Sequence, residues 1–509
     1  MKQYSDLEYL KLPKWKRFLY TIACFFAAIP GAVWGFIKKT GKSIADACID
    51  VKDGFVDIGR TFRYGDWKTR TSFFVMGFGN LARGQILRGI LFLLFEIVFF
   101  VYMFLGNGIY WLSMLPSLGK QGPEEVYSEI YDAYTTVYHD NSFRILLYSV
   151  LTLFFIVAFL YTWRANIKQN QIAEKILRSG KKLKSGKDDL RSVVDDQFHK
   201  TLLALPMTGI LVFTVLPIVF MILVAFTNYD GLHNGYTNEL FHWVGLDNFG
   251  EMLLWSSDGV SYAATFGEVL TWTLMWAFFA TFTNYFLGML VAMMINKKGI
   301  HLKKFWRTSL VLTIAVPQFI SLLYVSKMFA NDGLINGLLM NLGWIQTPLP
   351  FWTDPTWARV TVIITNIWIG IPYLMLIATG ILMNIPQDLY ESARVDGAGP
   401  LKQYTKITLP YMLFVTGPYL LTSFTSNMNN FNVIYLLTGG SPNSTMPSPG
   451  GALGETDLLI TWLFKLTTQE AADYNTASVI GILVFIVVAA ISLIVYNVIP
   501  SIKNEEDFQ

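Results

Sequence analysis

Long uninterrupted stretches of apolar residues dominate this sequence and limit what the chain can fold into. The hydrocarbon core of a bilayer is about 30 Å thick, and a helix needs roughly 20 apolar residues to cross it. Eight stretches meet this requirement: residues 86–106, 143–163, 203–227, 269–296, 307–329, 359–384, 408–428 and 476–498. Only 15% of the 509 residues are charged, against about 25% in ordinary soluble domains. The sequence therefore predicts an all-α polytopic membrane protein.

Lysine and arginine alternate between the two sides of these predicted spans. Segments 38–88 and 164–200 each hold ten basic residues, whereas 107–142 holds one and 228–268 holds none. Cytoplasmic loops keep the excess of positive charge in membrane proteins. Along the whole chain, 29 basic residues fall in predicted cytoplasmic segments and 2 in predicted outer segments. We therefore expect a multi-pass protein of the cell (plasma) membrane with both termini in the cytoplasm.

A further apolar stretch, 18–37, is interrupted by Pro30-Gly31 and has basic residues on both flanks. A single crossing would place one basic cluster outside, against the charge rule. We expect this stretch to be a re-entrant or interfacial segment within a cytoplasmic N-terminal region, 1–85. The alternative is a ninth span with the N-terminus outside.

The spacing of the spans predicts the domain organisation. Two auxiliary spans within 86–163 are followed by a basic cytoplasmic linker, 164–200, and by six core spans within 201–500. Residues 501–509 form a cytoplasmic tail. Positive-inside anchoring and attraction to anionic membrane lipid explain the charges of the linker. Because no aromatic platform accompanies them, nucleic-acid binding is not expected.

The sequence holds no arrangement typical of an enzyme or of a metal site. The nearest match to a phosphate-binding loop has five residues between Gly35 and Gly41, where the motif requires four. The five histidines lie between predicted spans, and no two have the i, i+4 spacing of a zinc protease, so no metal or other cofactor is expected. Glu96, in the first auxiliary span, has two interpretations: a hydrogen-bond partner between helices or a proton site.

The predicted cytoplasmic segment at residues 385–410 reads IPQDLYESARVDGAGPLKQYTKITLP. Pro386 and Asp388 favour the start of a helix and Gly397 its end, so a short amphipathic helix is expected at about 386–397. The spacing of its residues resembles the EAA signature of bacterial ABC importer permeases, in which this loop is a coupling helix that docks on a cytoplasmic ATPase subunit. The signature positions are Glu391, Ser392, Ala393, Gly397, Ile407, Leu409 and Pro410.

The resemblance extends beyond this loop. Across 200–500 the sequence is similar to MalF-type maltose/maltodextrin permeases, most clearly in IWIGIPYLM (367–375) and SFTSNMNNFNVIYLLTGGSP (423–442). This resemblance implies a six-helix type I ABC importer permease core, preceded by the two auxiliary spans. It also implies one permease half of an ATP-driven importer of maltose or maltodextrins. The expected partners are a second, MalG-like permease, a dimer of ATPase subunits that carries out the hydrolysis, and an extracytoplasmic solute-binding lipoprotein.

Polar residues in these stretches suit an uncharged sugar. Ser423, Asn427 and Asn430 follow i, i+4, i+7 spacing, which places neutral donors and acceptors on one helix face. In the maltose permease family the matching positions line the sugar site. The resemblance therefore implies substrate contacts at Ile369, Gly370, Tyr373, Ser423, Asn427 and Asn430. The alternative is that these polar groups only join helices.

Two other functions remain open at this point. One is a permease for another oligosaccharide, such as a galactoside or a multiple-sugar substrate. The other is an ion-coupled secondary carrier, which the uncharged middles of the core spans disfavour. Segment 228–268 is too short for the folded insertion of the enteric permease and resembles Gram-positive permeases instead. Its Tyr236, Phe241 and Trp243 are expected either to dock the binding protein or to form an aromatic belt.

Overall fold

The computed structural model describes residues 49–183, 198–254, 262–297, 299–451, 453–469 and 471–498. It also describes positions 13, 38, 41–43, 45, 46, 186, 188, 191 and 195. The chain divides into two compact units, Met1–Gly245 and Leu246–Gln509. The predicted first core span thus falls in the first unit, although we had expected the core to begin at residue 201. The predicted segment 18–37 and tail 501–509 lie outside the described residues.

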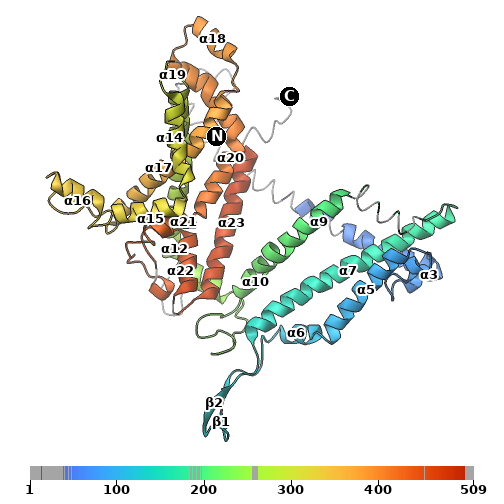
Figure 1. Ribbon diagram of the computed structural model, residues 1–509. Helices are drawn as coiled ribbons and strands as arrows, with labels where there is room; N and C mark the ends of the chain where they lie inside the picture. Colours follow the sequence, from blue (N-terminus) through green and yellow to red (C-terminus); the bar gives the residue numbers. More distant parts are fainter. Residues whose placement is uncertain are drawn as a thin grey trace. The chain divides into compact units, whose positions relative to one another are not determined.

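Seven of the described helices are long and apolar enough to cross a membrane. They are Ile86–Phe104, Ser142–Arg178, Phe198–Val224, Ala263–Asn296, Pro355–Leu382, Pro400–Met428 and Tyr474–Tyr496. Each overlaps a predicted span. The remaining prediction, a span over 307–329, corresponds to two helices with a bend between them. There, α14 (Lys303–Ala315) and α15 (Gln318–Met328) meet at an angle of 91° (Figure 1).

The bend between α14 and α15 has a local cause. Val316 has φ −80° and ψ 126°, which is extended backbone. Proline disfavours the helical conformation in the residue before it and brings no N–H to the helix ladder. The pair Val316-Pro317 therefore ends one helix and lets the next begin in a new direction.

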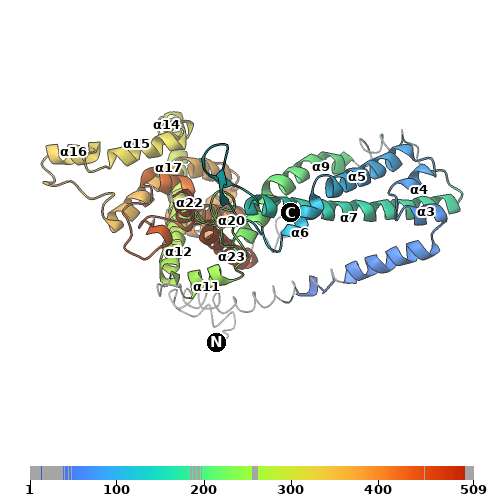
Figure 2. The ribbon, with the colours of Figure 1, turned by 90° about the horizontal axis from the view of Figure 1, so that it is seen from below.

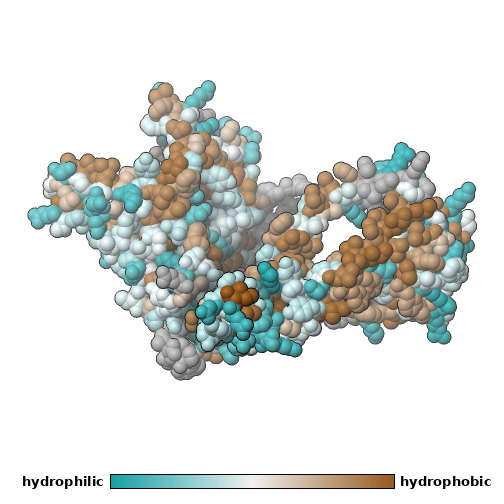
Figure 3. Space-filling view, turned by 60° about the horizontal axis from the view of Figure 1, so that its bottom comes forward, coloured by the Kyte–Doolittle hydropathy of each residue, from teal (hydrophilic) through white to brown (hydrophobic). Residues whose placement is uncertain are grey.

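The first unit contains a pair of long helices. Helix α5 (Ile86–Phe104) packs on α7 (Ser142–Arg178), and the rings of Phe99 and Phe159 stack with centroids 3.9 Å apart. Their exposed surface is strongly apolar (Figure 3), which suits a helix that faces lipid. The other elements are α6 (Gly108–Met114), the antiparallel hairpin β1 (Glu124–Ser128) and β2 (Ala133–Val137), α9 (Phe198–Ile210), the π turn η1 (Leu211–Val215) and α10 (Leu216–Val224).

Helix α7 continues to Arg178, past residue 163, where the sequence predicted the start of a linker. A segment before α5, made of a helix at 49–64, α3 (Trp67–Thr71) and α4 (Phe78–Leu81), packs on this extension. Asn166, Asn170 and Glu174 share one face of α7 because they are spaced by four residues. Asn166 Nδ2 donates to Ser72 O at 2.9 Å, and Thr69 Oγ1 donates to Glu174 at 3.0 Å. The residues predicted to be a linker therefore form part of a folded substructure.

Arg83 lies at the centre of this substructure, with only 1% of its side chain exposed. Its guanidinium donates to Asp66 Oδ1 at 2.5 Å, to Thr69 Oγ1 at 2.6 Å and to Asn170 Oδ1 at 2.7 Å. Burial opposes ionisation of Asp66, but hydrogen bonds from Thr69 and Arg83 and the Arg83 charge hold its pKa below the ordinary value of 3.8. The network needs Asp66 as a carboxylate.

Glu96 also serves this substructure. It is buried in α5, and its Oε2 accepts a hydrogen bond from the backbone N–H of Met76 at 2.8 Å. This contact favours the hydrogen-bonding interpretation of Glu96 over the proton site, although the partner is loop backbone rather than a second helix.

The second unit holds the remaining long helices. Helix α12 (Ala263–Phe278), the π turn η2 (Phe279–Thr283) and α13 (Asn284–Asn296) form one continuous span. Helix α13 packs along α17 (Pro355–Leu382), and a second span combines α19 (Pro400–Gln403), the π turn η3 (Tyr404–Thr408) and α20 (Leu409–Met428). The others are α11 (Asp247–Leu253), α16 (Leu334–Asn341), α18 (Gln387–Val395), α21 (Phe431–Leu437), the short 3₁₀ turn η4 (Pro449–Gly451), α22 (Leu459–Thr468) and α23 (Tyr474–Val498) (Figure 2).

Two apolar clusters hold this unit together. One contains Trp272, Trp276, Leu322 and Val362, and the other contains Tyr285, Met289, Met375 and Met412. Both clusters take residues from the α12–α13 span and from α17. These two elements therefore form the frame that carries the candidate site.

Candidate functional site

A cavity of about 410 Å³ lies where the α14–α15 bend faces α17. Three of the predicted substrate residues, Ile369, Gly370 and Tyr373, line it. Tyr373 and its neighbour Trp368 are about half exposed, at 52% and 50%. The other lining residues come from the bend: Thr313, Ile314, Val316, Pro317, Gln318 and Ser321. Every side chain around this cavity is uncharged.

The polar groups of the bend were not among the predicted site residues. Thr313, Gln318 and Ser321 add hydroxyl and amide groups opposite the two aromatic rings. Pro317, within an otherwise apolar stretch, was the signal that could have located them, because proline inside a helical pattern commonly marks a bend.

Gly370 has a different immediate role from the one we expected. A Cβ atom at this position would lie 2.2 Å from Asn284 Nδ2 and 2.7 Å from Asn284 Cγ. The missing side chain therefore lets the buried Asn284 of α13 pack against α17. Close approach of a ligand to Gly370 stays a prediction.

The polar residues of α20, Ser423, Asn427 and Asn430, are not among the residues that line this cavity. Tyr419 of the same helix connects the two groups, since it makes a side-chain hydrogen bond with Ser423 and interacts with Tyr373. Asn427 Nδ2 donates to Thr281 Oγ1 at 3.0 Å, and Asn430 Nδ2 donates to Asn427 Oδ1 at 3.2 Å. Asn430 also caps α21 through its side-chain oxygen. These contacts join helices, yet each amide keeps further hydrogen-bonding capacity. The cavity thus contains the α17 half of the predicted set, and the α20 half is connected to it through Tyr419.

The predicted coupling helix corresponds to α18, Gln387–Val395, within two residues of the expected 386–397. Glu391 and Ser392 are exposed, whereas Ala393 is half-buried. Gly397 has φ +74°, and the N–H of Ala398 donates to Ala393 O at 2.8 Å, which closes the helix end. A residue with a side chain would be strained at Gly397.

A side-chain contact connects the predicted coupling loop to the helix that follows it. Tyr390 Oη lies 2.8 Å from Thr408 Oγ1, at the junction of η3 and α20. Of the remaining signature positions, Ile407 and Leu409 are half-buried at this junction, and Pro410 lies in the first turn of α20. Leu389, Val395 and Leu401 project exposed apolar side chains, at 49%, 89% and 76%. Such a protruding apolar surface is typical of a protein contact site.

The aromatic residues of the 228–268 segment mostly pack within the chain. Phe241 is fully buried, and Trp243 Nε1 donates to Leu115 O at 2.9 Å. Tyr236 is 42% exposed and stacks on Tyr138. Neither expected role, partner docking or an aromatic belt, therefore fits Phe241.

Comparisons with known proteins agree with this architecture. The family model of the binding-protein-dependent transport system inner membrane component matches residues 284–501, which include α17, the coupling loop and α20. The maltodextrin transport system permease protein MalC of Streptococcus pneumoniae serotype 4 is 33% identical over 442 residues, covering 85% of this chain and 95% of MalC. MdxF of Bacillus subtilis, a maltodextrin permease, is 32% identical over 439 residues, with the same two shares. The galactooligosaccharide permease GanP of B. subtilis is 33% identical over 436 residues, covering 85% of this chain and 97% of GanP.

The fold and these relatives define a multi-pass membrane permease. The chain belongs to the family of binding-protein-dependent transport system inner membrane components. It is the permease component of an ABC transporter and is not itself the catalytic subunit. The predicted resemblance to MalF-type permeases is confirmed, since MalF proteins of Vibrio parahaemolyticus and Klebsiella aerogenes are 35% and 34% identical over about half of this chain.

Proposed function

We propose that this chain is one permease half of an ATP-driven importer of maltodextrins. The observation that carries the proposal is the cavity beside Tyr373 and Trp368. It combines two aromatic faces with hydroxyl and amide groups, and no lining residue carries a charge. A neutral solute rich in hydroxyl groups suits such a site, whereas an ion would find no counter-charge.

The expected partners follow from the family. A solute-binding protein delivers the sugar, and a second permease of similar fold completes the path. The relatives of Gram-positive origin support a membrane-tethered lipoprotein as the binding protein. ATP binding closes a dimer of ATPase subunits on α18, with Glu391 as the contact residue and Ser392 and Ala393 allowing close seating.

Helix α20 provides the mechanical link between the two sites. Its 20 residues span about 30 Å, from the contact between Tyr390 and Thr408 to the polar stripe at Ser423 and Asn427. Because one continuous helix joins them, a displacement of the coupling loop moves the stripe as well. Closure of the ATPase would thereby change the surroundings of the sugar.

Galactooligosaccharides are the second candidate substrate, because GanP is as similar to this chain as MalC is. Galactose and glucose units differ in the orientation of one hydroxyl group. A site of neutral donors and acceptors distinguishes the two sugars because the wrong orientation of that hydroxyl leaves one donor or acceptor of the site unpaired.

The test is ATP-dependent uptake of labelled maltotriose by the reconstituted complex, with galactooligosaccharides as competitors. We expect uptake that unlabelled maltotriose suppresses and galactooligosaccharides do not. Uptake of galactooligosaccharides in place of maltotriose would keep the importer and reject the substrate. Absence of any sugar uptake in a complex with active ATPase would reject the carbohydrate assignment.

The site residues are tested by Tyr373→Ala and Ser423→Ala in the same assay. Both side chains are partly exposed, so we expect reduced uptake with the complex still assembled. Failure of assembly in these variants would instead support the helix-joining interpretation.

A further inference from the structure

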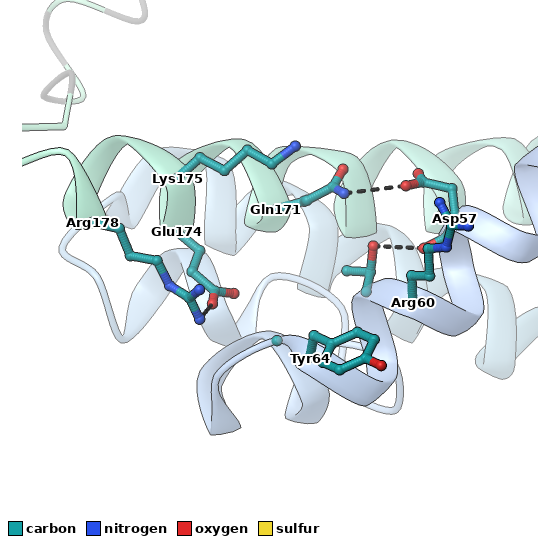
Figure 4. Close-up of a pocket in the computed structure, with 9 residues that line it drawn as sticks. Asp57, Arg60, Tyr64, Gln171, Glu174, Lys175 and Arg178 are labelled. Carbon is teal, nitrogen blue, oxygen red and sulfur yellow. Dashed lines mark hydrogen bonds and ion pairs between the residues drawn. The ribbon is translucent and has the colours of Figure 1, made fainter.

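A second pocket lies on the extension of α7, remote in sequence from the proposed sugar site. It has a volume of about 220 Å³, below the roughly 300–1,000 Å³ of pockets for drug-sized ligands. Residues of the 49–64 helix form one wall and residues of α7 form the other (Figure 4). Its charged and aromatic lining comprises Asp57, Arg60, Tyr64, Glu174, Lys175 and Arg178.

The two carboxylates of this pocket already have partners. Asp57 pairs with Arg164 at 3.2 Å and accepts a hydrogen bond from Gln171 at 3.3 Å. Glu174 accepts hydrogen bonds from the Asp66 N–H, from Thr69 Oγ1 and from Arg178. The acceptors of the pocket are therefore engaged in holding its walls together.

The donors of the pocket are largely unused. Arg60 and Lys175 are exposed, and neither side chain makes a hydrogen bond or ion pair with another residue in the part of the chain that the structure describes. Tyr64 is 68% exposed and adds a hydroxyl group to the same rim. A guanidinium and an ammonium group together suit an anionic, acceptor-rich ligand.

The apolar face of the 49–64 helix, on the side away from the pocket residues, indicates where the pocket lies relative to the membrane. Asp57, Arg60 and Tyr64 share one face at helical spacing, whereas Val51, Phe55 and Phe62 fall on the other. Those three apolar side chains are 58%, 69% and 43% exposed. An amphipathic helix of this kind lies in the membrane interface, and the charge rule places this segment on the cytoplasmic side, where anionic headgroups are available.

We propose that the pocket between the 49–64 helix and α7 binds a phosphate group through Arg60 and Lys175. The exposed apolar face favours the headgroup of an anionic phospholipid as its source, and a soluble phosphate ester is the other source of the same chemistry. Bound in this place, the phosphate bridges the N-terminal segment to the second auxiliary span.

The test is native mass spectrometry of the purified complex with two probes, phosphatidylglycerol and glycerol 1-phosphate. The variant is Arg60→Gln/Lys175→Gln. Its control, Lys52→Gln/Lys182→Gln, removes the same charge from exposed positions outside the pocket. At up to about fivefold for each direct exposed pair of opposite charges, the pocket variant should bind phosphatidylglycerol about 25-fold more weakly, whereas the control, which loses no direct contact with the phosphate, should bind like the parent.

The two probes identify the source of the phosphate. Lipid binding that glycerol 1-phosphate does not displace supports a phospholipid headgroup. Displacement by glycerol 1-phosphate, lost in the pocket variant, supports a soluble phosphate ester. The proposal is overturned if the pocket variant and the control bind phosphatidylglycerol equally and also bind glycerol 1-phosphate equally. Thermal unfolding of both variants at the temperature of the parent shows that the substitutions leave the fold intact.

Discussion

Close packing between α13 and α17 predicts a graded response to alanine substitution at three glycines. At Gly288 a Cβ atom would lie 2.6 Å from Leu374 Cβ and 3.2 Å from backbone atoms of α17, so only separation of the helices could relieve the clash. At Gly370 the clash is with the amide of Asn284, at 2.2 Å, and a side chain can shift. At Gly380, also on α17, no atom lies within 4 Å.

Overpacking of a close contact costs about 1–3 kcal/mol, and we place Gly288→Ala at the upper end and Gly370→Ala at the lower. Gly380→Ala should be neutral or stabilising by up to about 1 kcal/mol, because alanine favours the helix. Thermal unfolding of the purified complex should therefore rank the variants in this order. Asn284→Ala added to Gly370→Ala should restore stability, because the clashing amide is gone and its hydrogen bond to Asn366 O is long, at 3.5 Å.

Two outcomes would refute this reasoning. If Gly370→Ala unfolds at the temperature of Gly380→Ala, α13 and α17 do not approach as described. If Asn284→Ala rescues Gly288→Ala as well as Gly370→Ala, the loss of stability does not arise from the specific contacts given above.

Three further variants address the coupling loop and the substructure on α7. Glu391→Lys should abolish uptake by uncoupling the ATPase while membrane insertion remains normal, and normal uptake would remove the coupling assignment. Arg83→Met should cost about 1–3 kcal/mol, because Thr69 and Asn170 lose a buried hydrogen-bond donor, and should raise hydrogen exchange in 72–85. Because the pKa of Asp66 is lowered on folding, its stabilising effect is present above pH 3.8 and is lost as the pH falls through the folded value. Hydrogen exchange in 72–85 should therefore rise in acid, and Asp66→Asn should show no such acid-dependent increase.

Hydropathy predicted the spans well because the bilayer requires a fixed length of apolar helix. The same measure could not distinguish a straight span from the bent pair at Pro317, because the apolar stretch continues on both sides of the proline. The bounds of α18, the proposed coupling helix, were predicted to within two residues, since Asp388 and Gly397 act locally on its two ends.

The extension of α7 was missed for a different reason. Its lysines and arginines suggested a solvated linker. The β1–β2 hairpin, in the loop at 107–142, was also not predicted. The spacing of three polar residues could have predicted the continuation of the helix. Asn166, Asn170 and Glu174 are four residues apart and therefore lie on one helix face, which packs on another segment. The α17 residues of the proposed sugar site were predicted from the resemblance. Thr313 and Gln318, which line the same cavity, were not predicted, because their position depends on the bend at Pro317.

The π turns have a consequence for how these spans tolerate insertion and deletion. A π turn holds one more residue than the α-helical turn it replaces, and here such turns occur at Leu211–Val215, Phe279–Thr283 and Tyr404–Thr408. Deleting one residue inside such a turn converts it to α-helix and keeps the flanking faces in phase. The same deletion elsewhere in a span rotates everything beyond it by about 100°. Chain length within these membrane helices is therefore adjustable at three places without loss of the buried interfaces.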